Sequence, residues 1–273
     1  MKKSPDENAM KDLVCDVLEK PKYQHIHKGL IETVAATELA KGRKKKETQK
    51  AVLSKLHQIG AAYFSQQPDY EKWRIELASL PNDIHSDQAE AYCLKVMENH
   101  YSTDERLLIL PDFYQQILNS IKPIPSILDL ACGLNPLALP WMPIDDETRY
   151  YGCDIFTDMI DFLNTFAAHF GIHAKFEPCN LLDAAFNISA KIAFLLKTIP
   201  CLEQLKKGFI LELLDAIPAE YILFSYPISS LSGKSKGMRE NYTDQFTMII
   251  SSKSWEYERF EFSSELAFLI KKN

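Results

Sequence analysis

The sequence of 273 residues predicts an α/β domain preceded by a bundle of helices. Two patterns support this fold class. Up to about residue 100, apolar side chains recur at helical spacing, for example at Val52, Leu56, Ile59 and Tyr63. From residue 126 onward, short β-rich runs alternate with helical segments, which is typical of a parallel sheet with crossover helices.

The helical part is predicted to extend to residue 105. Similar apolar stripes occur near residues 11–19 and 88–98, and proline or glycine residues separate the segments. In "HYSTDERL", Ser102 followed by Glu105 fits a capping box, in which a hydroxyl and a carboxylate close the start of a helix. Arg106 would then lie in the first turn of that helix. We therefore expect a helical domain at 1–105 and an α/β domain at 106–273.

The strands of the α/β domain can be placed from their β-branched and aromatic runs. They are predicted at Ser126–Leu130, Arg149–Asp154, Ala174–Cys179, Ile192–Leu196, Tyr221–Ser225, Trp255–Phe262 and Leu266–Ile270. Helical segments are expected between the first five strands, which predicts right-handed crossovers and a parallel core. The last two strands lie too close together for a crossover and are expected to form an antiparallel hairpin.

The composition is that of an ordinary globular protein, with 46 % hydrophobic and 25 % charged residues. No apolar stretch approaches the length of a membrane span and no secretory leader opens the sequence, so we expect a cytoplasmic protein without membrane contact.

The six cysteines are scattered without a C-x-x-C pair, which disfavours a disulfide framework and a thiolate zinc site. His25 with His27, and His169 with His173, lack further ligands nearby, so no metal is expected. We expect a monomer.

The net charge of −6 gives no general sign of nucleic-acid binding, but basic residues are concentrated in one segment. Residues 41–57 contain seven lysines or arginines against the single Glu47. Such a segment either binds phosphates or is a solvated helix face, and its charge alone does not decide between the two. The candidate phosphate ligands there are Lys44, Lys45, Lys46, Lys50 and Lys55.

The stretch "SILDLACGLNPLALPW" (126–141) predicts a ligand site at the end of the first strand. Open α/β sheets bind ligands at the carboxyl ends of their strands, and Gly133 would let the backbone pass close to a ligand. A pyrophosphate cradle normally needs several glycines, so a ligand with adenosine and an amino-acid tail, S-adenosylmethionine, fits better. Asp154, 21 residues after Gly133, could accept bonds from both ribose hydroxyls, and Asn180 could meet the adenine edge. The alternative is that Asp129 and Asp154 only cap turns.

Several motifs together resemble one family, the aminoglycoside-resistance 16S rRNA (guanine-N7) methyltransferases. They are "KLHQIGAAYF" (55–64), "HYSTDERL" (100–107), "LDLACGLNPLALPW" (128–141), "GCDI" (152–155), "LLKTIPCLE" (195–203) and "SYPISSLSGKSKGMRENY" (225–242). The resemblance implies a Rossmann-like class I S-adenosylmethionine-dependent methyltransferase domain behind a helical domain that holds ribosomal RNA. It also implies methylation of a guanine N7 in the decoding-site helix of the assembled 30S subunit, which blocks aminoglycoside binding.

The resemblance also assigns expected roles to single residues. Arg106 would pair with the methionine carboxylate of the cofactor, Gly133 would lie beneath the methionine, and Asp154 would hold the ribose. Family members often carry Asp where Asn180 stands; Asn still offers an acceptor and a donor to adenine. The full expected cofactor set is Arg106, Asp129, Ala131, Gly133, Asp154, Ile155, Asn180, Leu181 and Lys197.

The chemistry predicts catalysis without a general base. Guanine N7 is already nucleophilic at neutral pH, so in-line alignment should suffice, and no catalytic residue is expected. The target base is expected to be flipped out of its helix. Candidate RNA contacts are Lys197 and, in a loop that Gly233 and Gly237 would let close over the base, Lys234, Lys236 and Arg239.

Three alternatives stay open at this point. The enzyme could methylate another RNA site or a small molecule, although a small-molecule enzyme gains nothing from the basic segment. The chain could be a non-catalytic RNA-binding homologue, against which Asp129, Gly133 and Asp154 argue. A nicotinamide oxidoreductase is disfavoured by the single glycine of the turn.

Overall fold

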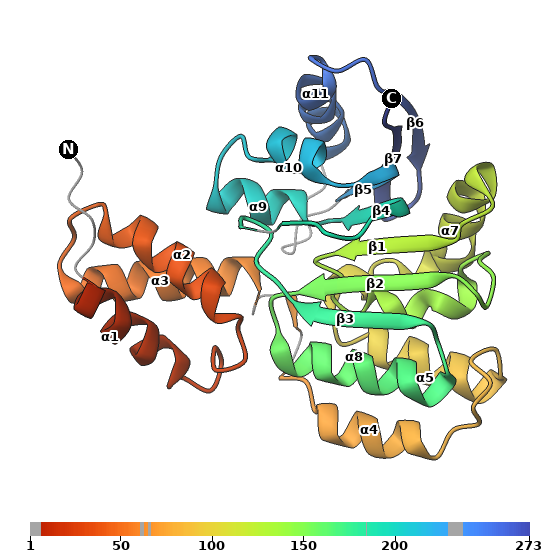
Figure 1. Cartoon of the computed structure of the whole chain (residues 1–273), viewed down its shortest axis with the longest axis horizontal. Helices are drawn as coiled ribbons and strands as arrows, with labels where there is room; N and C mark the ends of the chain where they lie inside the picture. Colours follow the sequence, from red (N-terminus) through yellow and green to blue (C-terminus); the bar gives the residue numbers. More distant parts are fainter. Residues whose placement is uncertain (1–6, 61–62, 65–66, 184, 229–236) are drawn as a thin grey trace.

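The computed structural model describes residues 7–60, 63–64, 67–183, 185–228 and 237–273. Seven strands form one mixed sheet in the order β3-β2-β1-β4-β5-β7-β6 (Figure 1). They are β1 (Ser126–Leu130), β2 (Arg149–Asp154), β3 (Ala174–Pro178), β4 (Ala190–Leu196), β5 (Ala219–Pro227), β6 (Glu256–Glu261) and β7 (Glu265–Lys271). Strands β1 to β5 are parallel to one another, and β7 is antiparallel to β5 and β6. The predicted parallel core and C-terminal hairpin are confirmed.

One of the expected crossover helices is absent. The link from β3 to β4 contains no helix in its described residues, 179–183 and 185–189, so the prediction of a helix there is wrong. To reach β4, the link must cross β2 and β1, a sideways distance of about 14 Å. Because β3 and β4 are parallel, it must also run back from the end of one strand to the start of the next, about 16 Å. Eleven residues span only about 16 Å as a helix, but about 36 Å when extended. Only an extended link is long enough.

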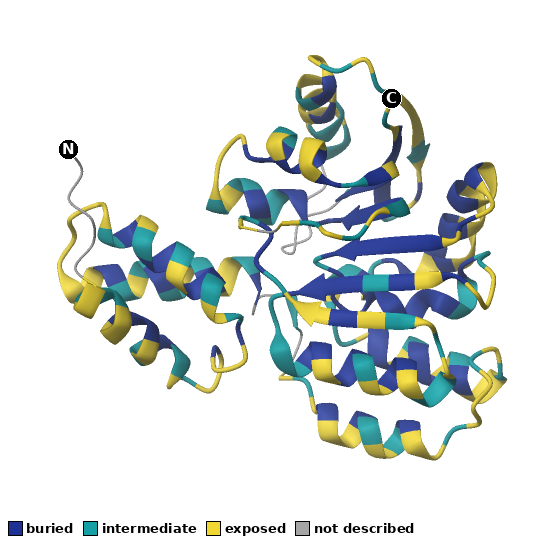
Figure 2. Ribbon diagram, in the orientation of Figure 1, coloured by how far each residue is buried: buried dark blue, intermediate teal, exposed yellow. Residues whose placement is uncertain are grey.

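Helices cover both faces of the sheet (Figure 1). On one side of the sheet lie α5 (Asp87–Met97), α7 (Leu110–Leu118) and α8 (Thr157–Phe170), with α4 (Tyr70–Ala78) packed against α8; on the other side lie α9 (Ile199–Leu205), α10 (Ile210–Ala216) and α11 (Met238–Ile250). Side chains of β1 alternate between the two cores: Ile127 belongs to the first, and Leu128 and Leu130 to the second. Figure 2 shows β1 buried along its length and β3 largely exposed at the edge.

The first three helices form a separate unit beside the carboxyl ends of the strands (Figure 1). This three-helix unit consists of α1 (Glu7–Leu18), α2 (Lys28–Leu39) and α3 (Lys45–Ile59), and it has its own apolar core. It is tied to the sheet where the backbone N–H of His27 donates to the carbonyl of Ile155 at 2.6 Å. By contrast, α4 packs beneath the sheet, with the Trp73 ring centroid 5.4 Å from that of Phe162 on α8. None of the described helices combines the length and the hydropathy needed to cross a membrane.

The short helix α6 (Tyr101–Asp104) begins two residues earlier than the capping box requires. His100 is its N-cap residue, and no side-chain capping bond is formed, so the predicted capping box of Ser102 and Glu105 is wrong. The Glu105 carboxylate instead accepts from Lys197 Nζ at 2.7 Å. A long-range ion pair has therefore replaced the local bond that the sequence pattern suggests.

Candidate functional site

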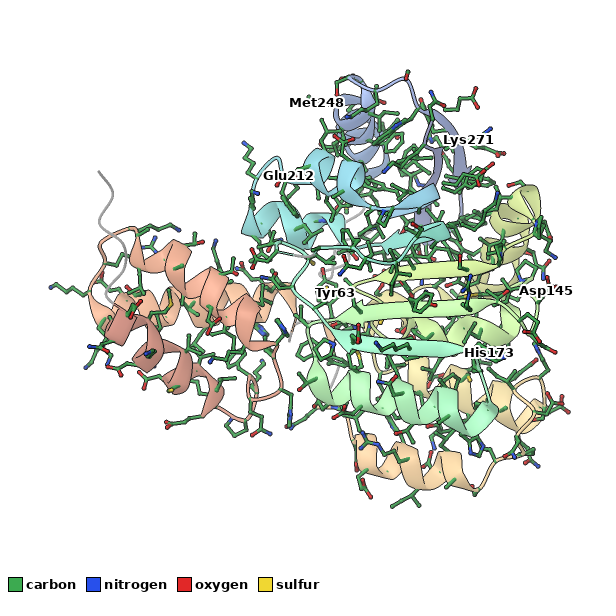
Figure 3. All side chains as sticks on the ribbon, in the orientation of Figure 1. Tyr63, Asp145, His173, Glu212, Met248 and Lys271 are labelled. Carbon is green, nitrogen blue, oxygen red and sulfur yellow. The ribbon has the colours of Figure 1, made fainter. Side chains whose placement is uncertain are left out.

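A cavity opens at the carboxyl ends of β1, β2 and β4, between the sheet and the three-helix unit. It contains about 750 Å³ of empty space including its open mouth, a size usual for ligand pockets. Tyr63, labelled in Figure 3, lies at this junction and lines the cavity. Most of the expected cofactor residues line it too, namely Ala131, Gly133, Asp154, Ile155, Asn180, Leu181 and Lys197.

The turn after β1 explains the glycine at position 133. Both Ala131 (φ 56°) and Gly133 (φ 51°) have left-handed backbone conformations, which glycine adopts without strain. A Cβ atom on Gly133 would lie 3.1 Å from Cε1 of His100. The absent side chain therefore permits both the tight turn and the close approach of the His100 ring.

Asp154 is placed at the cavity by backbone donors. Its Oδ2 accepts from the N–H of Gly133 at 2.9 Å, and its Oδ1 accepts from the N–H of Ile155 at 2.6 Å. Burial raises the pKa of Asp154, and these backbone bonds counteract the rise. A carboxylate has about four lone-pair positions, so the oriented group can still accept bonds from a ligand.

Asn180 follows β3 and is held by three neighbours. Its Nδ2 donates to Asp183 Oδ2 at 2.6 Å and to Thr33 Oγ1 at 3.0 Å, and its Oδ1 accepts from the N–H of Leu182 at 3.2 Å. Both amide hydrogens are thus engaged, and the carbonyl oxygen retains acceptor capacity. Because Thr33 belongs to α2, this network also links the three-helix unit to the cavity.

Arg106 and Asp129 do not line the cavity but lie behind it in a buried polar network. Arg106 donates from Nε and from one terminal nitrogen to the Glu265 carboxylate at 3.0 and 2.8 Å. Lys197 Nζ, which reaches the cavity wall, lies 3.5 Å from Glu265 Oε2. Burial opposes ionisation of Glu265, but the two cations outweigh it and hold its pKa below the ordinary value.

Asn135 joins this network to the end of β1. Its Oδ1 accepts from Arg106 at 2.9 Å and from the Tyr114 hydroxyl, and its Nδ2 donates to Asp129 Oδ2 at 2.8 Å. Burial raises the pKa of Asp129 to about 6, although bonds from the Tyr150 hydroxyl and from Asn135 counteract the rise. The residue after the tight turn therefore connects the buried ion pair to the strand-end carboxylate.

The basic segment lies on α3 and just before it. Lys44, Lys45, Lys46 and Lys50 are exposed, whereas Lys55 is half-buried with its Nζ 3.4 Å from a carboxylate oxygen of Glu38. Arg239, the second residue of α11, has a guanidinium nitrogen 3.5 Å from a carboxylate oxygen of Glu261. The remaining candidates, Lys234 and Lys236, lie outside the described residues.

Comparison with known proteins identifies the family. A family model described as "Ribosomal RNA methyltransferase (FmrO)" matches residues 19–269. The chain belongs to this family. It is 34 % identical over 220 residues to the 16S rRNA (guanine(1405)-N(7))-methyltransferase of Micromonospora rosea, covering 80 % of each chain. It is 29 % identical over 263 residues to a protein of the same name from Serratia marcescens, covering 96 % of this chain and 98 % of the relative.

Solved structures of similar proteins share the whole architecture. The 16S rRNA methyltransferase RmtF, crystallised in complex with S-adenosyl-L-homocysteine, superposes with a TM-score of 0.83 at 30 % identity, covering 98 % of this chain and 99 % of RmtF. The 16S rRNA methylase RmtB gives a TM-score of 0.78 at 25 % identity, covering 97 % and 98 %. The resemblance and the class I methyltransferase fold predicted from the motifs are confirmed.

Sequence reasoning missed several residues that the FmrO-family fold brings to the site. His100 and Cys201 line the cavity, and the Tyr63 hydroxyl lies 2.8 Å from Cys201 Sγ. Burial, together with the nearby Lys197 and Arg106 cations, lowers the pKa of His100 to about 3, so its ring is neutral. Among the described residues, no group of three or more His, Cys, Asp or Glu side chains is placed to hold a metal ion.

Glu265 is the missed residue with the clearest signal in the sequence. It is a fully buried carboxylate at the start of the apolar run "ELAFLIK". Charged side chains are almost never fully buried unless they are paired. A carboxylate opening a buried strand therefore predicts a buried cation, and Arg106 was the available partner.

Proposed function

We propose that this chain uses S-adenosylmethionine to methylate N7 of G1405 in the 16S rRNA of the 30S subunit, and that it thereby confers aminoglycoside resistance. The position comes from the names of its relatives, which are 34 % and 29 % identical over most of the chain. The observation that carries the proposal is the cavity, in which Asp154 and the Gly133 turn face the predicted adenosine and methionine ends. A ribosomal substrate also implies a cytoplasmic protein.

The residues of the cavity fit such a cofactor. Its lining is mainly apolar, as the adenine and methionine side chain require, and its oriented carboxylate at Asp154 suits two ribose hydroxyls. Lys197 also lines the wall, and it shares the buried Glu265 carboxylate with Arg106. Arg106 is held by Glu265 and Asn135 through three of its donor groups, so it adds positive charge behind this wall without lining the cavity. We therefore assign the methionine carboxylate to this cationic part of the wall.

The reaction does not require an acid or base from the protein. The bound cofactor supplies an electrophilic methyl group on a sulfonium, and guanine N7 attacks with a lone pair that needs no prior deprotonation. The role of the chain is to align the two and to exclude water. The Tyr63, His100 and Cys201 side chains line the cavity, and we assign to them part of the wall that excludes water.

We assign RNA docking to the three-helix unit and place its boundary near Gly60. Helices α4 and α5, although they precede residue 105, belong to the core beneath the sheet. The exposed lysines of α3 provide the phosphate-binding surface, since a cluster of cations on an acidic protein acts locally. We expect the protein to act as a monomer.

Mapping the modified base tests the proposal. Ribosomal RNA from susceptible bacteria expressing the chain would be treated with borohydride and aniline, which cleave at N7-methylguanine, and read by primer extension. We expect a new stop at G1405 that is lost with Asp154→Ala and retained with the exposed Glu258→Gln control. A stop at another guanine would make the chain an enzyme for another RNA site. No stop, with cofactor binding intact, would overturn the proposal.

A further inference from the structure

Two cysteines meet at the wall of the cavity. Cys153 is the second-to-last residue of β2, and Cys179 directly follows β3. The two strands are parallel neighbours, and the N–H of Cys179 donates to the carbonyl of Asp154 at 2.8 Å. As a result Cys153 Sγ donates to Cys179 Sγ across 3.0 Å. Both cysteines are free thiols, and both line the cavity.

We propose that Cys153 and Cys179 form an oxidation-sensitive thiol pair whose disulfide weakens ligand binding in the cavity. The oxidant is a peroxide. Attack of one thiolate on hydrogen peroxide gives a sulfenic acid and hydroxide, which takes up the thiol proton as water. The second thiol displaces the sulfenic oxygen as another water, forming the S–S bond. In total, two thiols are oxidised by two electrons and one peroxide is reduced to two waters.

The structure distinguishes the roles of the two sulfurs. Cys179 is half-buried, whereas Cys153 is buried, so Cys179 is the sulfur that peroxide reaches first. Cys153 is only 8 % exposed, and its bond to Cys179 together with burial raises its pKa. It therefore remains a thiol until it attacks the sulfenic acid. Both cysteines also line a second groove, beside the extended link from β3 to β4, through which a small oxidant can approach, and Cys179 is the more exposed of the two.

Disulfide formation would move the residues predicted to hold adenosine. A disulfide is about 2.05 Å long, so the sulfurs must approach by nearly 1 Å from their 3.0 Å contact. Each cysteine immediately precedes one predicted contact, Asp154 on β2 and Asn180 after β3. Binding groups must be held within about 0.5 Å, so we expect at least a roughly tenfold loss of cofactor affinity. This consequence rests on the proposed function, whereas formation of the disulfide does not.

The first part of the test is chemical. The purified full-length chain would be treated with hydrogen peroxide, alkylated, digested and analysed by mass spectrometry. We expect a peptide pair joined through Cys153 and Cys179, which dithiothreitol separates. The exposed Cys15 provides the control, because Cys15→Ser should form the same linkage. Failure to find this linkage, or its replacement by other pairings, would overturn the proposal.

The second part measures affinity. Calorimetric titration with S-adenosylhomocysteine should show at least tenfold weaker binding for oxidised chain than for reduced chain, with recovery after dithiothreitol. Peroxide should reduce the affinity of Cys15→Ser but should have much less effect on the affinity of Cys179→Ser. If Cys179→Ser does not fold, Cys153→Ala takes its place. An unchanged affinity despite the linkage would refute the switch. Absence of binding by the reduced chain would instead refute the proposed cofactor site and leave the linkage result standing.

Discussion

Replacing Glu265 by Gln tests whether the buried network supports the fold. The side chain is fully buried, bonds both Arg106 and the Ser225 hydroxyl, and lies 3.5 Å from Lys197 Nζ. Gln keeps the shape but removes the charge, and it turns an amide donor toward the donors of Arg106. Leaving buried charge uncompensated costs about 3–5 kcal/mol. Since Glu105 still pairs with Lys197 at 2.7 Å, we expect the lower end, about 3 kcal/mol.

Urea and thermal unfolding followed by circular dichroism would measure this loss. For a chain of this size it corresponds to a decrease of roughly 5 °C in Tm. The exposed Glu258→Gln on the neighbouring strand is the matched control and should change stability by less than about 0.5 kcal/mol. The double variant Arg106→Gln/Glu265→Gln should lose at least about 1 kcal/mol less than the sum of the single variants. If Glu265→Gln behaved like its control, the ion-pair reasoning would be refuted.

Three further predictions concern the cavity and the basic segment. Because the pKa of His100 is lowered to about 3, its neutral form contributes stability above pH ~6.5 that is lost as the pH falls toward 3. Urea titrations across this range should give a shallower acid decline for His100→Asn, by up to about 1.4 kcal/mol per pH unit; equal slopes would contradict this. Gly133→Ala should lower the free energy of unfolding by about 1–3 kcal/mol and weaken S-adenosylhomocysteine binding in calorimetry. Wild-type values for both would show that the turn tolerates a side chain. The double variant Lys44→Glu/Lys45→Glu should weaken 30S binding in filter assays while cofactor affinity stays intact. Unchanged 30S affinity would show that the basic segment does not contribute to ribosome binding.

The sheet could be predicted from the sequence because its signals are local. Each strand is a short β-rich run, and both core strands β1 and β4 are buried on two faces. The missing helix after β3 could not be predicted in this way. Its absence follows from the strand order, which sets the distance that residues 179–189 must span, and strand order is a property of the whole sheet.

The cavity was predictable only in part, for a related reason. Asp154 and Gly133 occupy strand ends, and strand ends can be recognised along the chain. The partners of Arg106 are remote: Glu265 is 159 residues away, and no spacing rule connects them. The same holds for Tyr63 and Cys201, which are 138 residues apart and meet only when the segment after α3 packs against α9.

Charge counting also overestimates the phosphate-binding surface. The carboxylate of Glu38, 1 % exposed, gathers Lys41, Arg43 and Lys55 at 2.6, 2.5 and 3.4 Å. Burial opposes ionisation of Glu38, but the lysines outweigh it and hold its pKa below the ordinary value. These three cations are therefore anchored to the fold.

Salt dependence can separate the anchored cations from the exposed lysines. Each exposed lysine that contacts a phosphate should change the slope of log K against log salt by about 1 when removed. Lys44→Gln should therefore reduce the slope for 30S binding and leave stability unchanged. Lys55→Gln should instead lower the free energy of unfolding, because it removes a partner from the buried Glu38, with little change in slope. Equal slope changes for the two variants would mean that Lys55 leaves Glu38 to bind RNA. The division of the basic segment into anchored cations and exposed, RNA-binding lysines would then be wrong.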